Sequence, residues 1–460
     1  MPSRRTFIKG TIATGLAFGG LAAYYGYRLK AERYTPGKSG YGPLVEDPAG
    51  VLSLPEGFHY KILSTAGEDM ADGLMLPGRP DAMAAFPGAD GKVVVVRNHE
   101  LTSDDTEVSP FGDDESRFSL VDPAKLYDPG VSGKRQLGGT TTFVFDPQSR
   151  QIEKQFLSLG GTLRNCAGGA TPWGSWLSCE ETTRLAGGDR QVDHGYIFEV
   201  PARADGGLVD PLPLVAMGRF QHEAAAVDPR TGIVYLTEDQ GDSLFYRFIP
   251  EKPGELAAGG RLQALAIKGR KRLDTTNHDE PTVRLGQTLE TYWVDLDDPE
   301  SKDDSLRARG QADGAAVFVR GEGMWYGRNG IYFVSTTGGA LQIGQIWHYL
   351  PSPHEGTSGE SEAPGRLSLL VEPNDPTLME MADNITVAPW GDLIVCEDGN
   401  LTDHIRGVTP EGELYTLARN EASHSEFAGA CFTPDGETLL VNMQADQLTV
   451  AIWGPWAARR

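Results

Sequence analysis

Carboxylate side chains recur in this sequence at a similar distance before a glycine. The six glycines of the pattern are Gly91, Gly174, Gly232, Gly330, Gly391 and Gly436. The residues eight to ten positions before them are Asp81, Cys166, Glu223, Glu322, Asp383 and Glu426. Grouped carboxylates suit hard cations such as Ca²⁺, which takes roughly six to eight oxygen ligands, whereas a thiolate suits a transition metal better. The pattern therefore predicts a mixed site, with iron or another transition metal beside calcium.

A second set of acids follows the same glycines. Its members are Glu180, Glu238 and Glu397, with Glu100 at the end of the longer first copy and Glu181 and Asp239 directly after two of the others. Like charges at close range raise one another's pKa, and burial adds to the cost of ionisation, so such a group needs compensating cations. All six are candidate metal ligands. In the fourth copy, Ser335-Thr336-Thr337 stands where an acid is expected.

The segments that carry these acids have the pattern of β-hairpins. Each has two runs rich in Val, Ile, Tyr and Trp, joined by a turn of the Pro-x-Gly, Asn-Gly or Asp-Gly kind. The six segments are 81–100, 165–181, 222–239, 322–338, 383–399 and 426–444. In a hairpin, the first strand begins at the end where the second strand stops. The twelve positions should therefore meet on one face of a ring of hairpins.

A less regular pair of strands follows each hairpin, except that the fourth strand of the last copy is missing. The N-terminal strand 58–63 fits that vacancy, because propellers close their ring with strands from both termini. We therefore predict an all-β fold, a six-bladed β-propeller that forms a single domain over 45–460. The stretches 101–137 and 270–318 should be loop insertions over one face, and 352–366 a flexible surface loop.

The first thirty residues have the character of an export signal. Ser3-Arg4-Arg5-Thr6-Phe7-Ile8-Lys9 is similar to the twin-arginine consensus, and a weakly apolar, Gly-rich run follows it. Residues 1–30 would act as a cleaved signal peptide or as an uncleaved membrane anchor. The interpretation implies an encounter with the twin-arginine export machinery and a periplasmic or extracellular location.

The formal net charge of −23 argues against nucleic acid as a partner. The basic residues of the first thirty positions have no acids beside them, so the rest of the chain is still more acidic. Such a surface repels an anionic substrate unless bound cations reverse the local field.

Three further residues are candidates for contact with a substrate. Arg320 lies two residues before Glu322 and offers a bidentate fork for phosphate or carboxylate. Asn384 and His222 lie beside Asp383 and Glu223, where they could bind the substrate or orient a ligand. A salt bridge is the alternative role for Arg320. The cysteines other than Cys166 are expected to be small buried side chains: Cys179, Cys396 and Cys431.

At these residues the sequence resembles the PhoX-type alkaline phosphatase family. The motifs that carry the resemblance are the twin-arginine signal, Asn98-His99-Glu100, Asn165-Cys166-Ala167-Gly168-Gly169, Cys179-Glu180-Glu181, Gln221-His222-Glu223, Arg320-Gly321-Glu322-Gly323-Met324-Trp325, Asp383-Asn384 and Cys396-Glu397-Asp398-Gly399. The resemblance implies a periplasmic six-bladed propeller that cleaves phosphomonoesters with two iron and three calcium ions. Cys166, Glu223, Glu322 and Asp383 would bind iron, Glu180, Glu238 and their neighbours calcium, and Arg320 the phosphate of a small phosphorylated substrate.

Two other functions stay open at this point, because the chain is shorter than the phosphatases that define the family. A calcium-dependent lactonase or organophosphate hydrolase would depend on His222, whereas a phosphatase would depend on Cys166. A non-catalytic propeller would hold calcium for structure and bind a ligand or partner.

Overall fold

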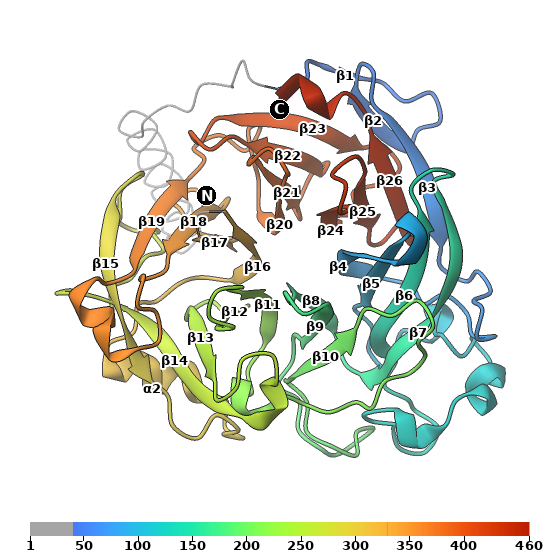
Figure 1. Ribbon diagram of the computed structural model, residues 1–460, viewed down its shortest axis with the longest axis horizontal. Helices are drawn as coiled ribbons and strands as arrows, with labels where there is room; N and C mark the ends of the chain where they lie inside the picture. Colours follow the sequence, from blue (N-terminus) through green and yellow to red (C-terminus); the bar gives the residue numbers. More distant parts are fainter. Residues whose placement is uncertain (1–39, 329, 460) are drawn as a thin grey trace, which may run out of the picture.

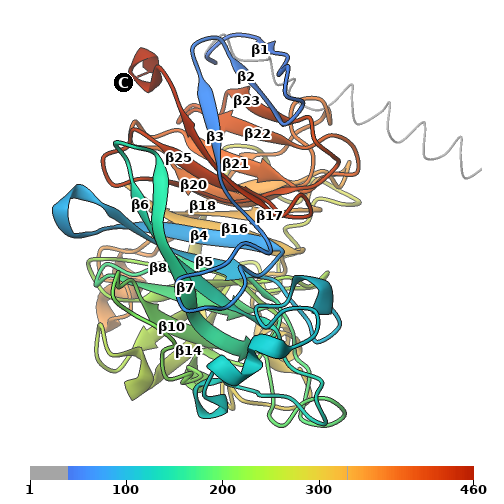
Figure 2. The same ribbon diagram turned by 90° about the vertical axis from the view of Figure 1, so that its right-hand side faces the viewer.

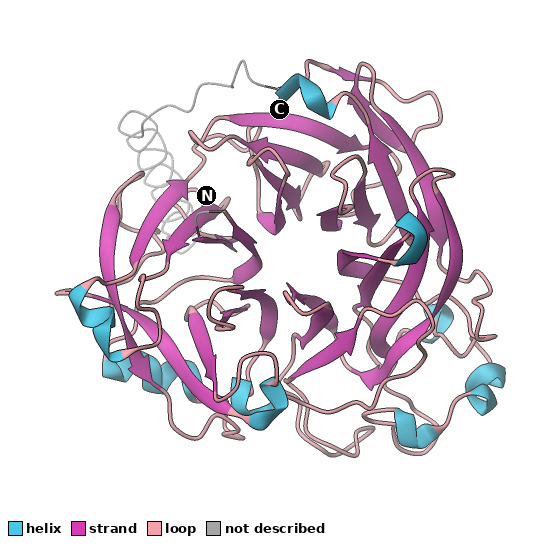
Figure 3. Cartoon of the chain, viewed as in Figure 1, coloured by secondary structure: helices cyan, strands magenta, loops and turns pink. Residues whose placement is uncertain are grey.

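Strands arranged around a central axis form the framework of the protein in the computed structural model, which describes residues 40–328 and 330–459 (Figure 1). Helices are short, and most lie towards the outside of the ring (Figure 3). They are η1 (Ala89–Gly91), η2 (Thr106–Val108), η3 (Ser116–Leu120), η4 (Pro123–Lys125), η5 (Val215–Met217), η6 (Leu256–Ala258), α2 (Leu306–Asp313), η7 (Ser358–Glu362) and η8 (Trp456–Arg459). Within the described residues, none is long and apolar enough to cross a membrane. The predicted signal of residues 1–30 lies outside the described part of the chain.

Six inner strands surround the axis, and each lies against the next until the last meets the first. They are β4 (Pro80–Pro87), β8 (Asn165–Ala170), β11 (His222–Val227), β16 (Gly321–Gly327), β20 (Ala382–Val387) and β24 (Phe427–Phe432). Each pairs antiparallel with the strand that follows it: β5 (Val93–His99), β9 (Ser175–Glu180), β12 (Val234–Glu238), β17 (Gly330–Ser335), β21 (Leu393–Glu397) and β25 (Leu439–Met443). These pairs are the six hairpins predicted from the sequence.

Further strands extend each hairpin outward. They are β6 (Gly138–Asp146), β7 (Gln151–Thr162), β10 (Ile197–Pro201), β13 (Tyr246–Pro250), β14 (Gly260–Ile267), β18 (Gln345–Leu350), β19 (Arg366–Val371), β22 (His404–Val408), β23 (Leu414–Asn420) and β26 (Leu448–Trp453). The N-terminal strand β3 (His59–Thr65) pairs with β26, as predicted for the closure of the ring. The buried Arg97 on β5 reinforces this closure, because its guanidinium donates to Ser64 on β3 and to Thr449 on β26.

The outer strands do not form six separate four-stranded sheets. The strand β15 (Thr288–Asp295) pairs with both β14 and β19, and so joins two hairpin units into one nine-stranded sheet. Residues 270–318 were expected to be a loop, but they supply β15 and α2. The short strands β1 (Leu44–Val45) and β2 (Leu52–Pro55) extend the outer edge at β23. The protein is thus an all-β, propeller-like ring whose sheets differ in size.

Two other expectations need correction, one about a strand and one about a loop. The second hairpin lacks one strand of the less regular pair predicted to follow each hairpin. Residues 211–218 lie where that strand was expected, but they make a single bridge at Pro213 and then turn into η5, since proline cannot donate to a sheet. Residues 352–366 were expected to be a flexible loop. Two of their acids, the buried Glu355 and the nearby Glu360, form ion pairs with the buried Arg247 and fix the segment against the ring.

The insertion 101–137 extends from one end of the ring, on the side opposite to the turn that joins β4 and β5 (Figure 2). It contributes Leu101, Phe111, Val121 and Leu126 to an apolar cluster that it shares with residues outside the insertion, namely Met70, Leu74, Leu76 and Leu157. This end of the ring is also where the inner strands begin, so the insertion borders the region in which the predicted acids meet.

Candidate metal centre at one end of the axis

Five of the predicted metal ligands lie in β-bulges of the inner strands. In all six hairpins, three residues of the inner strand lie opposite two residues of its partner, and in five of them the bulge contains the predicted ligand. The five residues are Asp81, Cys166, Glu223, Glu322 and Asp383. A bulge bends the strand and redirects a side chain that regular alternation would send elsewhere. The fold therefore aims these groups at the axis.

The neighbouring hairpin holds several of these bulges. On β5, the Asn98 amide donates to the carbonyl oxygens of Cys166 and Ala167 at 3.0 and 2.7 Å. On β12, the Thr237 hydroxyl donates to the Glu322 carbonyl at 2.6 Å. On β25, Asn442 makes the equivalent bond to the Asp81 carbonyl. Each contact joins the second strand of one hairpin to the first strand of the next, so ring packing itself positions the acids.

Glycines allow the close approach of inner strands. A Cβ atom on Gly169 would lie 2.1 Å from the carbonyl oxygen of Ala225, and one on Gly323 would lie 2.6 Å from that of Asp383. A side chain at either place would push two inner strands apart. The glycines of the Asn165–Gly169 and Arg320–Trp325 motifs are therefore required by packing around the axis.

One backbone hydrogen bond recurs in all six hairpins and fixes their equivalence. The N–H of the residue just beyond the second strand donates to the carbonyl oxygen of the residue just before the first strand. The donors, which we call the second axial set, are Glu100, Glu181, Asp239, Thr336, Asp398 and Gln444. The acceptors, which we call the entrance set, are Arg79, Arg164, Gln221, Arg320, Met381 and Glu426. The first axial set follows two residues later: Asp81, Cys166, Glu223, Glu322, Asp383 and Ala428.

This equivalence corrects the place of Glu426. Counting back from the turn glycine put Glu426 in line with Asp81, but the structure puts Ala428 there and Glu426 in the entrance set. The error arises because the number of residues between the bulge and the turn glycine varies between hairpins. Burial and the charges of Asp383 and Asp398 still raise the pKa of Glu426, so it belongs to the same acidic region.

Three predicted ligands, Glu180, Glu238 and Glu397, lie one residue before the second axial set and turn away from the axis, because side chains alternate along a strand. Each is buried and bonded to its own sheet. Glu238 accepts a hydrogen bond from the hydroxyl of Tyr246 at 2.6 Å, and Glu397 accepts one from Arg406 at 2.8 Å. The structure therefore does not bring these three into the candidate metal centre.

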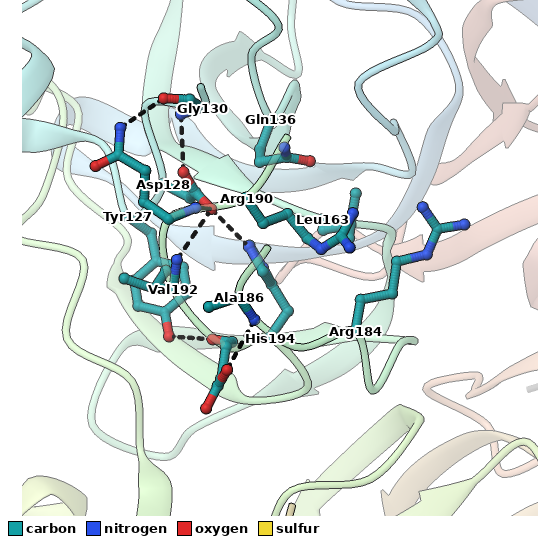
Figure 4. Close-up of polar contacts among 12 residues, drawn as sticks. Tyr127, Asp128, Gly130, Gln136, Leu163, Arg184, Ala186, Arg190, Val192 and His194 are labelled. Atoms are coloured by element: carbon teal, nitrogen blue, oxygen red, sulfur yellow. Dashed lines mark hydrogen bonds and ion pairs between the residues drawn. The ribbon is translucent and has the colours of Figure 1, made fainter. Parts of the chain in front are cut away.

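Glu180 is bound by an extended polar network. The His194 ring contacts Glu180 through Nδ1 at 2.6 Å and Asp128 through Nε2 at 3.2 Å, and all three side chains are buried. Figure 4 shows His194 beside Asp128, whose carboxylate also accepts from backbone N–H groups. Burial alone would lower the pKa of His194, but the two carboxylates outweigh it and raise the pKa to about 9. The network ties the insertion 101–137 to β9.

The remaining ligand candidates form three overlapping groups. Within each group the ligand atoms lie within 4.8 Å of one another. The groups are Asp81, Glu100 and Cys166; Cys166, Glu181 and Glu223; and Glu223, Glu322 and Asp383. Cys166 and Glu223 each belong to two groups, so the three form a continuous row. We call this row, together with Asp239 and Asp398 of the second axial set, the acidic mouth.

Glu223 gives the most direct sign that a ligand belongs here. Its side chain is fully buried, and no donor among the described residues reaches either of its carboxylate oxygens. A buried carboxylate without partners is costly. Burial and the charges of Glu181 and Asp383 accordingly raise its pKa well above the usual range. Cations bound to Glu223 would remove this cost, and the carboxylate and thiol donors around it fit hard and transition-metal ions respectively.

Other members of the acidic mouth also have raised pKa values. Burial first, and the charge of Asp398 second, raise the pKa of Asp383 to about 7. Burial likewise raises the pKa of Glu181 to about 7, although Arg164 opposes the shift. The thiol of Cys166 lies 3.8 Å from Asp81, and burial and nearby acids raise its pKa well above the usual value. This charge distribution favours cations.

Arg320 lies at the acidic mouth, where it forms salt bridges, which were the alternative role that the sequence left open for it. Its Nε and Nη2 donate to Asp239 at 2.8 and 2.9 Å, and Nη2 also donates to Glu322 at 2.7 Å. Asn384 is held between two strands: its Nδ2 donates to Asp383 at 3.2 Å, while its Oδ1 accepts from the Gly429 N–H at 2.8 Å. Asn384 thus orients Asp383.

His222 is not part of the acidic mouth. Its ring packs on Phe220 with centroids 3.6 Å apart, and its Nε2 contacts the carbonyl oxygen of Gly218 at 2.9 Å. Burial lowers its pKa to about 3, so the ring is neutral near pH 7. The structure therefore gives His222 a packing position on the far side of β11 from Glu223. The cysteines Cys179, Cys396 and Cys431 are buried and free, as expected.

Sequence reasoning missed Asp398 as a site residue. It lies one position after Glu397, and burial and the charge of Asp239 raise its pKa. The alternation of side chains along the strand was the signal that could have found it, because the same rule separates Glu181 from Glu180 and Asp239 from Glu238.

The axis is nearly closed below the acidic mouth. Its cavity has a volume of about 20 Å³, and small residues such as Ala82, Ala167, Ala224 and Gly323 line it. This is little more than the room that one water molecule needs. This cavity is therefore too small to hold a substrate.

An all-β ring with buried acids and a thiol at one end of its axis defines a class of protein, the β-propeller with a candidate metal centre. The sequence model of the family described as alkaline phosphatase PhoX matches residues 39–446. The chain therefore belongs to the PhoX alkaline phosphatase family, whose members are phosphatases. No curated protein matches the sequence.

Solved structures with the same architecture include Pseudomonas fluorescens PhoX in complex with vanadate, a transition state analogue. The likeness has a TM-score of 0.65 and 16% identity, and it covers 92% of this chain and 97% of that chain. A gluconolactonase from Xanthomonas campestris gives a TM-score of 0.38 and 11% identity over 91% of this chain and 99% of that chain. The first likeness supports the fold, and the second is too weak to bear on function.

Proposed function

We propose that this protein hydrolyses phosphomonoesters with metal cations held at the acidic mouth. The observation that carries the proposal is the buried, unpartnered carboxylate of Glu223, which joins the Cys166 group to the Glu322 and Asp383 group. Membership of the PhoX family supports phosphoryl chemistry at this place. The vanadate complex of the Pseudomonas fluorescens protein supports it further, since that ligand is a transition state analogue in a protein of similar fold.

We further propose that the cations are iron and calcium, in the ratio of two to three. Cys166, Glu223, Glu322 and Asp383 would hold iron, because a thiolate and shared carboxylates suit a transition metal. Calcium would take the oxygen-rich flanks, where the side chains are Asp81, Glu100, Glu181, Asp239 and Asp398. Glu180, Glu238 and Glu397 are left out, since their oxygens already accept hydrogen bonds within their own sheets.

Cations held at the acidic mouth would supply the positive charge that a phosphoryl group needs while negative charge develops on its oxygens. The chain's own contribution is to bind and orient. Arg320 offers its guanidinium to a phosphate oxygen beside Glu322. Asn384 fixes the Asp383 carboxylate, and the bulges held by Asn98 and Thr237 fix Cys166 and Glu322. The closed axis beneath the mouth limits the entry of water from the opposite end.

We propose that the ring counts as six blades, one for each inner strand, with β15 as a link between two of them. The match of the PhoX family to residues 39–446 supports a single propeller domain that begins after the N-terminal segment.

Export by the twin-arginine pathway to the periplasm or outer surface, with or without retention of a membrane anchor, is also part of the proposal. The observation behind this export route is the motif Ser3-Arg4-Arg5-Thr6-Phe7-Ile8-Lys9. Replacing both arginines, Arg4→Lys and Arg5→Lys, should leave the protein in the cytoplasmic fraction, and recovery of the double variant in the periplasm would contradict the export route.

The hydrolysis of p-nitrophenyl phosphate tests the proposed activity. Purified protein should release p-nitrophenol, a chelator should abolish the release, and iron with calcium should restore it. Cys166→Ser should lower the turnover strongly, whereas His222→Gln should retain most of it if the variant folds. Turnover that persists after complete removal of metal by the chelator would contradict the proposal.

A further inference from the structure

Two arginines occupy matched places at the acidic mouth. Arg164 and Arg320 both belong to the entrance set, and each stands two residues before a member of the first axial set, Cys166 and Glu322. Both have left-handed backbones, with φ of 51° and 43°. This conformation is uncommon for residues other than glycine, so the fold holds both arginines in an unusual local geometry.

The contacts of the two guanidiniums are also matched. Arg320 donates hydrogen bonds to Glu322 and Asp239. Asp239 lies at the end of the hairpin that precedes the hairpin of Arg320. Arg164 pairs through Nη2 with Glu100 at 2.8 Å, and Glu100 likewise ends the preceding hairpin. The same Nη2 atom also pairs with Glu181. Each arginine thus bridges two acids of the mouth.

Both arginines keep donors for a further anion. The ion pairs of Arg164 use Nη2, and its buried Nε meets no acceptor among the described residues. Those of Arg320 use Nε and Nη2, so Nη1 of each residue lies outside these contacts. The side chains of Arg164 and Arg320 are 39% and 33% exposed, whereas those of Glu100 and Glu181 are 14% and 8% exposed. The guanidiniums therefore lie on the solvent side of the acids.

We infer that Arg164 is a second phosphate-binding residue, which faces the substrate from the side of the acidic mouth that Arg320 does not cover. The inference rests on the proposed function. Cations bound to Glu100 and Glu181 would satisfy the carboxylates that Arg164 now neutralises, and its guanidinium could then donate to a phosphate oxygen. A planar, permanently charged fork suits that bond better than a lysine does.

Arg79 provides a matched control. It belongs to the same entrance set, stands two residues before Asp81, and has a φ of 44°. Its guanidinium forms an ion pair with Asp105 at 3.2 Å, within the insertion 101–137. An Arg79→Met variant therefore removes an arginine from the equivalent position of the preceding hairpin, but it does not remove a bridge between two acids of the mouth.

The experiment measures the binding of inorganic phosphate to metal-loaded protein by calorimetry, with the metal content of every sample determined by elemental analysis. Arg164→Met and Arg164→Lys should retain the full metal content and weaken phosphate binding by about 10- to 100-fold, the loss expected for one charge-assisted contact. Arg79→Met should stay within about twofold of the wild type. Unchanged phosphate affinity in both Arg164 variants, or loss of metal from both, would overturn the inference.

The wild type and Arg320→Lys separate this inference from the proposed function. If metal-loaded wild type fails to bind phosphate at all, the proposed function fails. If wild type binds phosphate and Arg320→Lys weakens binding while both Arg164 variants do not, the function stands and Arg164 is excluded as a phosphate ligand.

Discussion

Glu180 and Glu181 are consecutive residues, yet their carboxylates lie on opposite sides of the chain. Glu180 accepts hydrogen bonds from the N–H groups of Leu163 and Gly195 and contacts His194 at 2.6 Å. Glu181 joins Cys166 and Glu223 in the acidic mouth and pairs with Arg164. One acid therefore stabilises the sheet, and its neighbour is available to a cation.

This relationship predicts different results for two matching substitutions. Glu181→Gln should lower metal content and phosphatase activity, with little loss of stability in the metal-free protein. Glu180→Gln should leave the ligand set intact but lower the free energy of unfolding by about 1 to 3 kcal/mol, because it weakens a buried charge-assisted network. Elemental analysis and urea unfolding of both variants provide the comparison. Equal metal loss in the two variants would show that the alternation of side chains does not divide their roles.

Replacing Glu223 should have opposite effects with and without metal. In metal-free protein, Glu223→Gln removes an unpartnered buried carboxylate, so the melting temperature should rise. In metal-loaded protein, it removes a shared ligand, so metal content and thermal stability should both fall. Differential scanning calorimetry with chelator and with added iron and calcium measures both effects. A variant less stable than the wild type in chelator would contradict the cost assigned to this carboxylate.

The stability of metal-free protein should decline as pH rises from about 4.5 to 7. The pKa values of Asp383 and Glu181 are raised to about 7 by burial and neighbouring charge. An acid with a raised pKa in the folded state stabilises the fold while it is protonated and loses that contribution as pH rises through the folded-state pKa. Each carboxyl should contribute on the order of 3 kcal/mol. Urea unfolding at pH 5 and 7.5 should show the decline in chelator and a much flatter profile with cations. Parallel profiles in the two conditions would contradict it.

His194 predicts a separate pH effect at higher pH. Its raised pKa of about 9 means that its stabilising charge is fully present below about 6.5 and is lost as pH rises through about 9. Unfolding in chelator at pH 6.5 and 9.5 should show this loss, and His194→Gln should reduce the difference. His99→Gln is the control, because burial lowers the pKa of His99 well below the usual value and keeps that ring neutral. If His99→Gln changed the difference as much as His194→Gln does, the charge on His194 would not be its source.

The sequence allowed much of the ring to be predicted, because its signals are local. Turn glycines and alternating apolar runs located the six hairpins, and the unpaired run 58–63 located the closing strand β3. Gathering the acids at one end followed from hairpin geometry. The bulges did not follow, since they depend on contacts such as that of Asn98 with the next hairpin.

The remaining errors also come from contacts between distant segments. Strand β15 has no turn signal of its own and is a strand because β14 and β19 flank it. Glu426 was placed two residues out of register, because the distance to the turn glycine varies. Glu397 was chosen in place of Asp398, although strand alternation points to the latter.

The most direct test of a metal-dependent phosphatase at the acidic mouth is a titration of chelated protein with iron and calcium while p-nitrophenyl phosphate turnover is followed. We expect turnover to be absent without cations, to rise with bound iron and calcium to a plateau, and to stay absent in Glu223→Gln at the same added cations. Full turnover without bound metal, or metal-loaded wild type without turnover, would contradict the account.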